Sequence, residues 1–216
     1  MEFTLWDILR NLLLATRWTI ALSIAGFVCG GAGGLLLLVF RIARSPAIRT
    51  SARLYIELFQ GTPLLLQLFL VFFGLPLIGL NVRPWLAAGV GLTLSASAYL
   101  AEIWRGCVEA LPAGQWDAAA ALGLHRRYQL QLVILPQALR IAVPPTVGFL
   151  VQLVKSTALT SIIGFDELLR TGNVITNATF APFTVYGVVA LIYFAVCFPL
   201  TLMARRLELR LSRRSA

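Results

Sequence analysis

The stretch GQWDAAAALGLHRRYQLQLVILPQALR, residues 114–140, gathers alanines, amides and arginines around a central Gly-Leu-His. It lies in a chain of 216 residues, of which 59% are hydrophobic and only 12% are charged. Soluble domains carry about 25% charged residues, so this chain cannot cover its apolar surface with polar groups in water. The composition predicts an integral membrane protein in which residues 114–140 are a short, half-polar exception.

Long apolar runs on both sides of this stretch mark the expected membrane crossings. Each run approaches or exceeds the ~20 residues that a helix needs to cross a bilayer. Their continuity indicates helices, because the strands of a membrane barrel would be alternating segments of ~10 residues. The sequence therefore predicts an all-α integral membrane protein, a single domain over residues 1–216, with five transmembrane helices at 18–40, 58–80, 85–101, 141–165 and 181–204.

The arginines predict the orientation of these five helices. Thirteen of the 17 arginines lie between the first and second spans, between the third and fourth, or after the fifth. Because positively charged segments stay in the cytoplasm, we expect the N-terminus outside and the C-terminus inside. The net charge of +9 is then explained by the arginines expected on the cytoplasmic side of the membrane. No basic face with interleaved aromatic residues occurs, so nucleic acid is not an expected partner.

The opening stretch is consequently expected on the cytoplasmic side. Its alanine-rich residues 117–122 favour a short helix, with Asp117 at the positive end of the helix dipole. Gly123 should end this helix, and a second short helix is expected over 126–135, before Pro136 introduces the next span. Two short helices joined by a glycine favour contact with an intracellular protein, and an amphipathic helix lying on the bilayer is the alternative.

A glycine ladder in the first span predicts close helix packing. Gly26, Gly30 and Gly34 recur every fourth residue and therefore share one helix face. Without side chains, this face lets another helix approach closely.

Polar residues near a weak point of the second span are candidates for a transport pathway. Gly61 and Pro63 should weaken that helix, while Gln60 and Gln67, seven residues apart, are expected on one face. Interrupted helices with polar residues near the membrane are typical of transport pathways, because protein or water must satisfy the freed backbone groups.

The fourth span carries a polar stripe of its own. Gln152, Lys155 and Ser156 share a face at i, i+3 and i+4. A lysine inside a membrane span is energetically costly, which makes it a functional candidate. The alternative is a lysine that snorkels or pairs with a carboxylate such as Glu57 or Glu102.

The motifs of the chain resemble the permease subunits of bacterial ABC importers. Their cytoplasmic signature is Glu-Ala-Ala, three residues, Gly, nine residues, Ile, one residue, Leu-Pro. The matching positions are Asp117-Ala118-Ala119, Gly123, Val133 and Leu135-Pro136. Five further stretches are similar to the polar amino-acid branch of that family: GTPLLLQLF (61–69), AYLAEIWRG (98–106), LPAGQWDAAAALGL (111–124), VILPQALRIAVPP (133–145) and LVKSTAL (153–159). The resemblance covers roughly residues 15–210.

The resemblance implies a permease of the bacterial inner membrane with a cytoplasmic two-helix coupling segment, about 106–136, between helices 3 and 4. Its expected partners are a second permease subunit, identical or different, a pair of cytoplasmic ATP-binding subunits, and a periplasmic or extracellular amino-acid-binding protein. The implied ATPase-coupling residues are Asp117, Ala118, Ala119, Gly123, Leu124, Arg126, Leu135 and Pro136. The implied substrate-pathway residues are Gln60, Thr62, Gln67, Ser95, Gln152, Lys155, Ser156 and Thr157.

The chain itself is expected neither to be an enzyme nor to bind a cofactor or metal. Its three cysteines are scattered without a C-x-x-C pair, and its only histidine, His125, has no array of catalytic partners. No G-x-x-x-x-G-K-[ST] loop occurs, so ATP and Mg²⁺ are expected in the partner ATPase. A secondary transporter and a non-transporting membrane scaffold are the alternatives, the first disfavoured because no clear inverted repeat occurs.

Several positions depart from the family pattern. Asp117 replaces the customary glutamate, Gln60 an arginine and Ser95 an asparagine. The customary Lys-Asp-Thr-Ser is Lys155-Ser156-Thr157-Ala158 here, so the carboxylate beside the lysine is missing. Because nothing at this place would meet a second positive charge on the substrate, we expect neutral or acidic amino acids to be preferred over cationic ones.

Overall fold

The computed structural model describes residues 4–41, 43 and 45–215, with side chains described as far as Leu211. All regular structure within these ranges is helical, as the sequence predicts. The α-helices are α1 (Leu5–Arg41), α2 (Pro46–Gly61), α3 (Leu64–Phe69), α4 (Leu75–Leu77), α5 (Pro84–Glu109), α6 (Ala113–Ala121), α7 (Arg126–Tyr128), α8 (Leu135–Ser156), α9 (Leu168–Thr179) and α10 (Pro182–Ser215). Two π-helical turns, η1 (Leu70–Gly74) and η2 (Gln129–Ile134), and a 3₁₀ turn, η3 (Thr157–Ser161), complete them.

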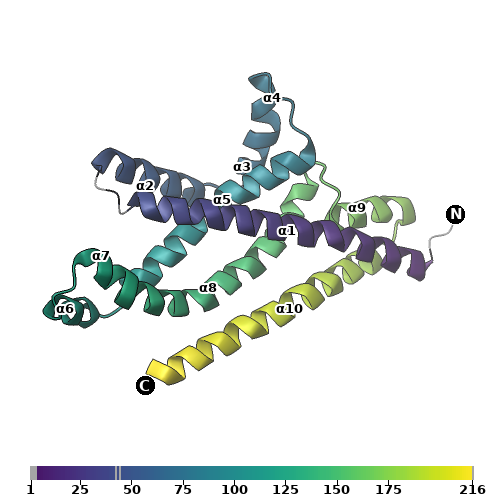
Figure 1. The fold of residues 1–216 in the computed structure, drawn as a ribbon. Coiled ribbons are helices and arrows are strands. Elements are labelled where there is room, and N and C mark those ends of the chain that lie inside the picture. Colours follow the sequence, from purple (N-terminus) through teal and green to yellow (C-terminus); the bar gives the residue numbers. More distant parts are fainter. Residues whose placement is uncertain (1–3, 42, 44, 216) are drawn as a thin grey trace.

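Four helical stretches are long and apolar enough to cross a membrane: 5–41, 84–109, 126–161 and 182–211. A fifth candidate consists of α2 together with 64–77, two helical pieces that meet at an angle of 107°. The three arginine-rich segments gather at one end of the molecule, where the α1–α2 connection, α6, α7 and the end of α10 lie (Figure 1). The N-terminal end of α1 and helix α9 lie at the opposite end (Figure 1).

The weak point predicted at Gly61 and Pro63 in the second span is a complete break between two helices. Helix α2 ends at Gly61, and Thr62 and Pro63 have extended backbones with ψ of 141° and 133°. A proline disfavours helical geometry in the residue before it, which explains the break at Thr62. Beyond the break, 64–77 project away from the bundle as a separate arm (Figure 1).

Because of the break, Gln60 and Gln67 belong to different helices, and the prediction that they share one helix face is wrong. The Gln60 amide donates to the backbone carbonyl of Ala98 at 3.4 Å. Gln67 is buried, and its amide donates to the carbonyls of Phe59 at 2.8 Å and Thr62 at 3.0 Å. These carbonyls belong to the last turn of α2 and its cap, so Gln67 satisfies backbone acceptors that the interrupted helix leaves free.

The glycine ladder packs α1 tightly against α5, as the sequence predicts. A Cβ built on Gly30 would lie 2.5 Å from the Cβ of Ala96, closer than two carbon atoms can approach. A Cβ on Gly34 would lie 3.1 Å from the carbonyl oxygen of Ser97. The two backbones can lie this close only because these positions carry no side chain.

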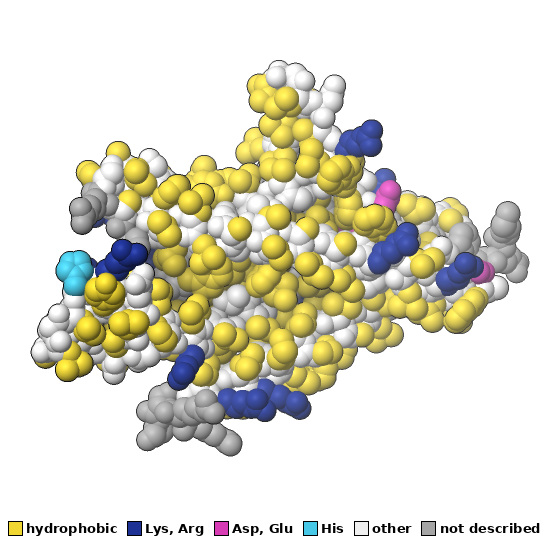
Figure 2. Space-filling model, viewed as in Figure 1, with side chains coloured by type: hydrophobic (Ala, Val, Ile, Leu, Met, Phe, Trp, Pro, Cys, Tyr) yellow, Lys and Arg dark blue, Asp and Glu magenta, His cyan; other side chains and the backbone are white. Residues whose placement is uncertain are grey.

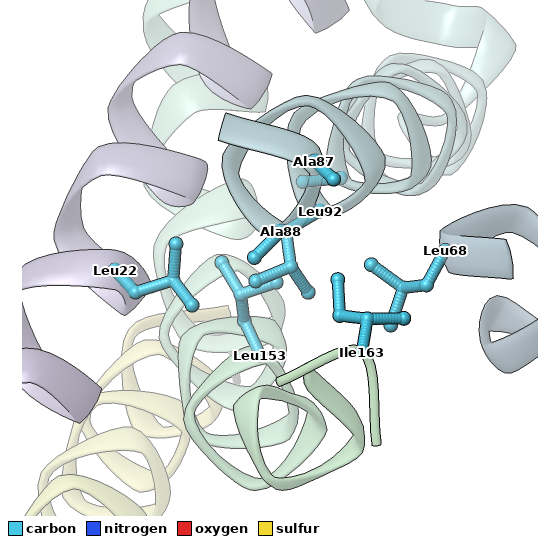
Figure 3. Packing of buried hydrophobic residues seen from close by; sticks show 8 residues of the cluster. Leu22, Leu68, Ala87, Ala88, Leu92, Leu153 and Ile163 are labelled. Atoms are coloured by element: carbon cyan, nitrogen blue, oxygen red, sulfur yellow. The ribbon is translucent and has the colours of Figure 1, made fainter. Parts of the chain in front are cut away.

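One buried apolar cluster ties the arm to the bundle. Leu22 of α1, Leu68 of α3, Leu92 of α5 and Leu153 of α8 converge on it, together with Ile163 after η3 (Figure 3). Small residues of α5 complete the cluster: Ala87, Ala88 and Ala96. The cluster fixes the base of the arm, while the rest of 64–77 extends beyond it.

The prediction of a separate short helix over 126–135 is also wrong. Residues 126–161 form one continuous helical stretch, and Pro136 lies inside it. A proline has no N–H and crowds the carbonyl four residues earlier. The π-helical turn η2, directly before Leu135, changes the backbone pairing at this place, so the chain passes Pro136 without a break.

Candidate coupling surface and translocation pathway

Helix α6 begins at Ala113, four residues earlier than predicted. Asp117 therefore lies beyond the first turn, and the expected favourable placement at the helix dipole is wrong. The predicted end of the helix is correct, because Gly123 has a φ of +72°. Its N–H donates to the carbonyl of Ala120 at 2.9 Å, and the N–H of Leu124 donates to Ala119 at 3.2 Å, which closes the helix end.

Helix α6 is fixed to the start of the long helix by apolar and polar contacts. Leu111, Ile134 and Ala138 form a small buried cluster, against which Trp116 packs. The amide of Gln137 donates to the side-chain oxygen of Gln115 at 3.0 Å. Residues 111–138 thus form a packed unit whose core includes Val108 of α5 and Ala138 of α8.

This unit exposes both polar and large apolar side chains at one end of the molecule. Leu122, Leu132 and Tyr128 are 79%, 65% and 54% exposed. Of the predicted coupling residues, Asp117, Ala118, Gly123, Arg126 and Pro136 are exposed, Leu124 and Leu135 are partly buried, and Ala119 is buried. Figure 1 shows α6 and α7 projecting from the bundle, which leaves this surface accessible.

A cavity of about 330 Å³ brings together four of the predicted pathway residues. Thr62 comes from the break after α2, Ser95 from α5, and Gln152 and Ser156 from α8. Its apolar lining is Leu64, Tyr99, Phe149 and Leu153. Tyr99 and Phe149 stack with their ring centres 5.7 Å apart. The sequence analysis missed this aromatic pair, whose members are 50 positions apart in the chain and carry no local signal.

The remaining predicted pathway residues lie elsewhere. Gln60 and Gln67 bond to backbone carbonyls, and buried Thr157 donates to the carbonyl of Val154 at 2.7 Å. Lys155 lines a different cavity, of about 430 Å³, between α8 and α10. Gln152 lines both cavities.

Lys155 makes no ion pair with any residue that the structure describes. The two carboxylates considered as its partners are engaged by arginines of their own helices. Glu57 accepts from Arg53 at 2.7 Å. Glu102 pairs with Arg105, which also contacts Glu109. The alternative in which Lys155 pairs with Glu57 or Glu102 is therefore wrong.

A buried carboxylate that the sequence analysis missed lies at the opposite end of the bundle. Glu167 precedes α9 and is fully buried. Its carboxylate accepts from the backbone N–H of Arg170 at 2.7 Å, from the Tyr193 hydroxyl at 2.9 Å and from the Thr19 hydroxyl at 3.4 Å. Burial raises the pKa of Glu167, against the opposing effect of these donors. The carboxylate thereby connects α1, α9 and α10.

The helices form a bundle with a cavity that collects polar side chains, and α6 projects at one end beside the start of the long helical stretch 126–161 (Figure 1). The family model described as "Binding-protein-dependent transport system inner membrane component" matches residues 24–213, and the chain belongs to that family. It is a membrane transport subunit and not an enzyme, and ATPase activity lies in a separate subunit.

The individual proteins to which the chain is similar include permeases of amino-acid ABC transporters, which confirms the resemblance found in the sequence. The chain is 37% identical over 202 residues to the probable amino-acid ABC transporter permease YckA of Bacillus subtilis, covering 89% of each chain. It is 33% identical to the glutamine transport system permease GlnP of Escherichia coli, over 96% of this chain and 95% of the relative. A crystal structure of an amino acid ABC transporter with histidines superposes with a TM-score of 0.91, at 30% identity, covering 97% of this chain and 100% of the other.

Proposed function

We propose that this chain and a second permease subunit together form the membrane pathway of an ATP-driven amino-acid importer. In this proposal residues 114–136 receive the movement of a cytoplasmic ATPase, and an external binding protein delivers the amino acid. The observation that carries the proposal is the cavity of about 330 Å³, because it collects polar side chains from three candidate membrane-spanning segments.

The exposure of two polar side chains of α8 supports a second permease subunit. Gln152 and Lys155 are exposed on this chain although both lie in a stretch that is apolar enough to span the membrane. Polar and charged side chains at this depth face protein or a water-filled cavity, since contact with lipid is costly. A second permease that covers this face of α8 would enclose a polar passage between the two subunits.

The unpaired ammonium of Lys155 supports an amino acid as the cargo. Every amino acid carries a carboxylate, and a lysine that makes no ion pair with a described residue can bind it. Ser156, which stands where the family pattern quoted above has an aspartate, offers no carboxylate to a second positive charge. We therefore retain neutral or acidic amino acids as the preferred substrates.

The packed unit around α6 supports mechanical coupling. Its exposed apolar side chains provide a contact surface for a partner, and its shared core transmits movement to α5 and α8. The chain contains no phosphate-binding loop, so ATP and Mg²⁺ would be bound by that partner. With the arginine-rich end in the cytoplasm, the N-terminus lies outside and the C-terminus inside.

The proposal is tested by reconstituting the chain with its ATPase and binding protein and measuring amino-acid uptake. Gln152→Leu removes the amide that lines both cavities and should lower uptake at least tenfold, with unchanged membrane insertion and unchanged co-purification of the ATPase. Asn11→Leu, an exposed amide near the start of α1, is the matched control and should transport normally. Uptake by this chain alone, without ATP, would support a secondary transporter instead.

A further inference from the structure

One face of the last part of α10 points away from the rest of the protein. The helix packs against its neighbours through Val185, Val189, Ile192 and Cys197. Beyond Cys197 none of its described side chains, up to Leu211, is buried. Six residues there share one face at spacings of three and four, and line a surface hollow of about 380 Å³: Pro199, Leu202, Met203, Arg206, Leu207 and Arg210. We call these six residues the outer strip.

The outer strip is apolar at one end and cationic at the other. Arg206 and Arg210 are four residues apart, which places their side chains one above the other on the same face. Neither makes an ion pair with a described residue. The nearest carboxylate in the sequence, Glu208, lines the cavity between α8 and α10 together with Arg205, and so belongs to another face of the helix. The outer strip therefore carries two uncompensated positive charges.

The apolar and cationic residues follow one another along the strip as the acyl chain and the charged headgroup follow one another in a phospholipid. Pro199 and Arg210 are eleven residues apart, which corresponds to about 16 Å of helix and compares with ~15 Å for one leaflet of hydrocarbon. In Figure 2, basic side chains border hydrophobic ones at the end of the molecule near the C-terminus.

We propose that the outer strip binds an anionic phospholipid of the leaflet in which α10 ends. The lipid phosphate lies between the guanidinium groups of Arg206 and Arg210, which donate paired hydrogen bonds to phosphate oxygens. An acyl chain lies along Leu202, Met203 and Pro199. Since all six residues come from one helix, the strip lies open to the bilayer and receives the lipid laterally. The proposal does not depend on the transported substrate.

The experiment uses the chain purified with its partner subunits in a mild detergent, with phosphatidylglycerol and phosphatidylcholine of the same acyl chains as probes. Native mass spectrometry measures how much of each lipid remains bound. Arg206→Gln and Arg210→Gln should each lower phosphatidylglycerol retention about fivefold, as expected for removal of one cation near a lipid headgroup. Neither substitution should change phosphatidylcholine retention. Arg205→Gln is the matched control, because it removes the same charge from the adjacent face and should leave retention unchanged.

The outcomes separate a lipid site from its alternatives. An equal loss in the Arg205→Gln variant would show a general charge effect and overturn the proposal. Displacement of phosphatidylglycerol by millimolar inorganic phosphate would identify a free-anion site and overturn it as well. Disulfide formation between two copies of a Met203→Cys variant in native membranes, with Cys29, Cys107 and Cys197 replaced by serine, would show that protein covers the strip. Lipid retention that follows Arg206 and Arg210 but not Arg205 establishes the site.

Discussion

The hydroxyl of Tyr193 in α10 donates a 2.9 Å hydrogen bond to the carboxylate of Glu167, which caps the start of α9. Thr19 of α1 contacts the same carboxylate and accepts from the N–H of Leu168 at 3.1 Å. Helix α1 and the consecutive helices α9 and α10 thus share one buried acid. Such a group holds the helices in register because each donor would be left unsatisfied without it.

Removal of this acid should destabilise the bundle. Glu167→Ala leaves buried donors without an acceptor, which costs about 1–3 kcal/mol of unfolding free energy. Tyr193→Phe removes one hydrogen bond and should cost about 1 kcal/mol. Thermal unfolding of the detergent-purified protein measures both. Asp166→Asn, one residue earlier and exposed, serves as the control and should change the midpoint little, because its 3.8 Å ion pair with Arg170 is exposed to solvent. An unaltered midpoint in Glu167→Ala would refute the role of the carboxylate as a connector.

The same residue should make stability depend on pH. Because burial raises the pKa of Glu167 in the folded protein, the folded state favours the protonated form. Its contribution is fully present below the unfolded pKa of about 4.3 and is lost as pH rises through the folded pKa. Glu167→Gln cannot titrate and should flatten this part of the curve. The unfolding midpoint as a function of pH, compared between wild type, Glu167→Gln and Asp166→Asn, checks the sign.

Local sequence signals predict the elements of this fold that depend on local backbone geometry. The glycine ladder of α1, the weak point at Gly61–Pro63 and the helix end at Gly123 all follow from the properties of single residues. The course of the chain after a break does not, because the 107° bend is set by the apolar cluster around Leu68, whose other members come from four distant segments.

The candidate site was predictable in part for the same reason. Lys155 and Ser156 lie three and four residues after Gln152, which places them about 60° and 40° away on opposite sides of it. Periodicity groups all three on one broad face, but the structure divides them between two cavities that this face borders. Glu167 escaped notice because two of its donors, Thr19 and Tyr193, are 148 and 26 residues away.

The close approach of α1 and α5 should tolerate no added side chain at Gly30. Gly30→Ala places a Cβ 2.5 Å from that of Ala96, and relieving the overlap should cost about 1–3 kcal/mol of stability. Gly31→Ala is the control, since the nearest atom to its Cβ is 3.8 Å away in the Trp104 ring. The double variant Gly30→Ala, Ala96→Gly removes the main contact and should recover part of the loss. Strictly additive effects of the two substitutions in thermal unfolding would contradict direct packing.

Gly123 should be required for its backbone conformation and not for space. A Cβ there meets none of the described atoms within 4 Å, yet the φ of +72° strains most side chains. Asparagine tolerates this region and valine does not, so Gly123→Asn should keep most uptake while Gly123→Val should abolish uptake and substrate-stimulated ATPase activity. Membrane insertion should be normal in both. Full uptake in Gly123→Val would remove the coupling role of this helix end.

The unpaired charge of Lys155 should set the preference among substrates. Lys155 is followed in sequence by Ser156, where the family pattern has an aspartate, so a substrate with a second positive charge meets the Lys155 ammonium without a carboxylate at the neighbouring position. Competition for uptake should therefore rank acidic and neutral amino acids above arginine and lysine. Lys155→Gln should weaken the competition by acidic substrates most, because they lose a favourable charge interaction. Ser156→Asp should strengthen the competition by cationic substrates. Arg205→Gln, which removes a positive charge lining the same cavity nearer to the helix end, should leave the ranking unchanged. Arginine or lysine as the strongest competitor of the wild type would show that Lys155 does not select the substrate charge.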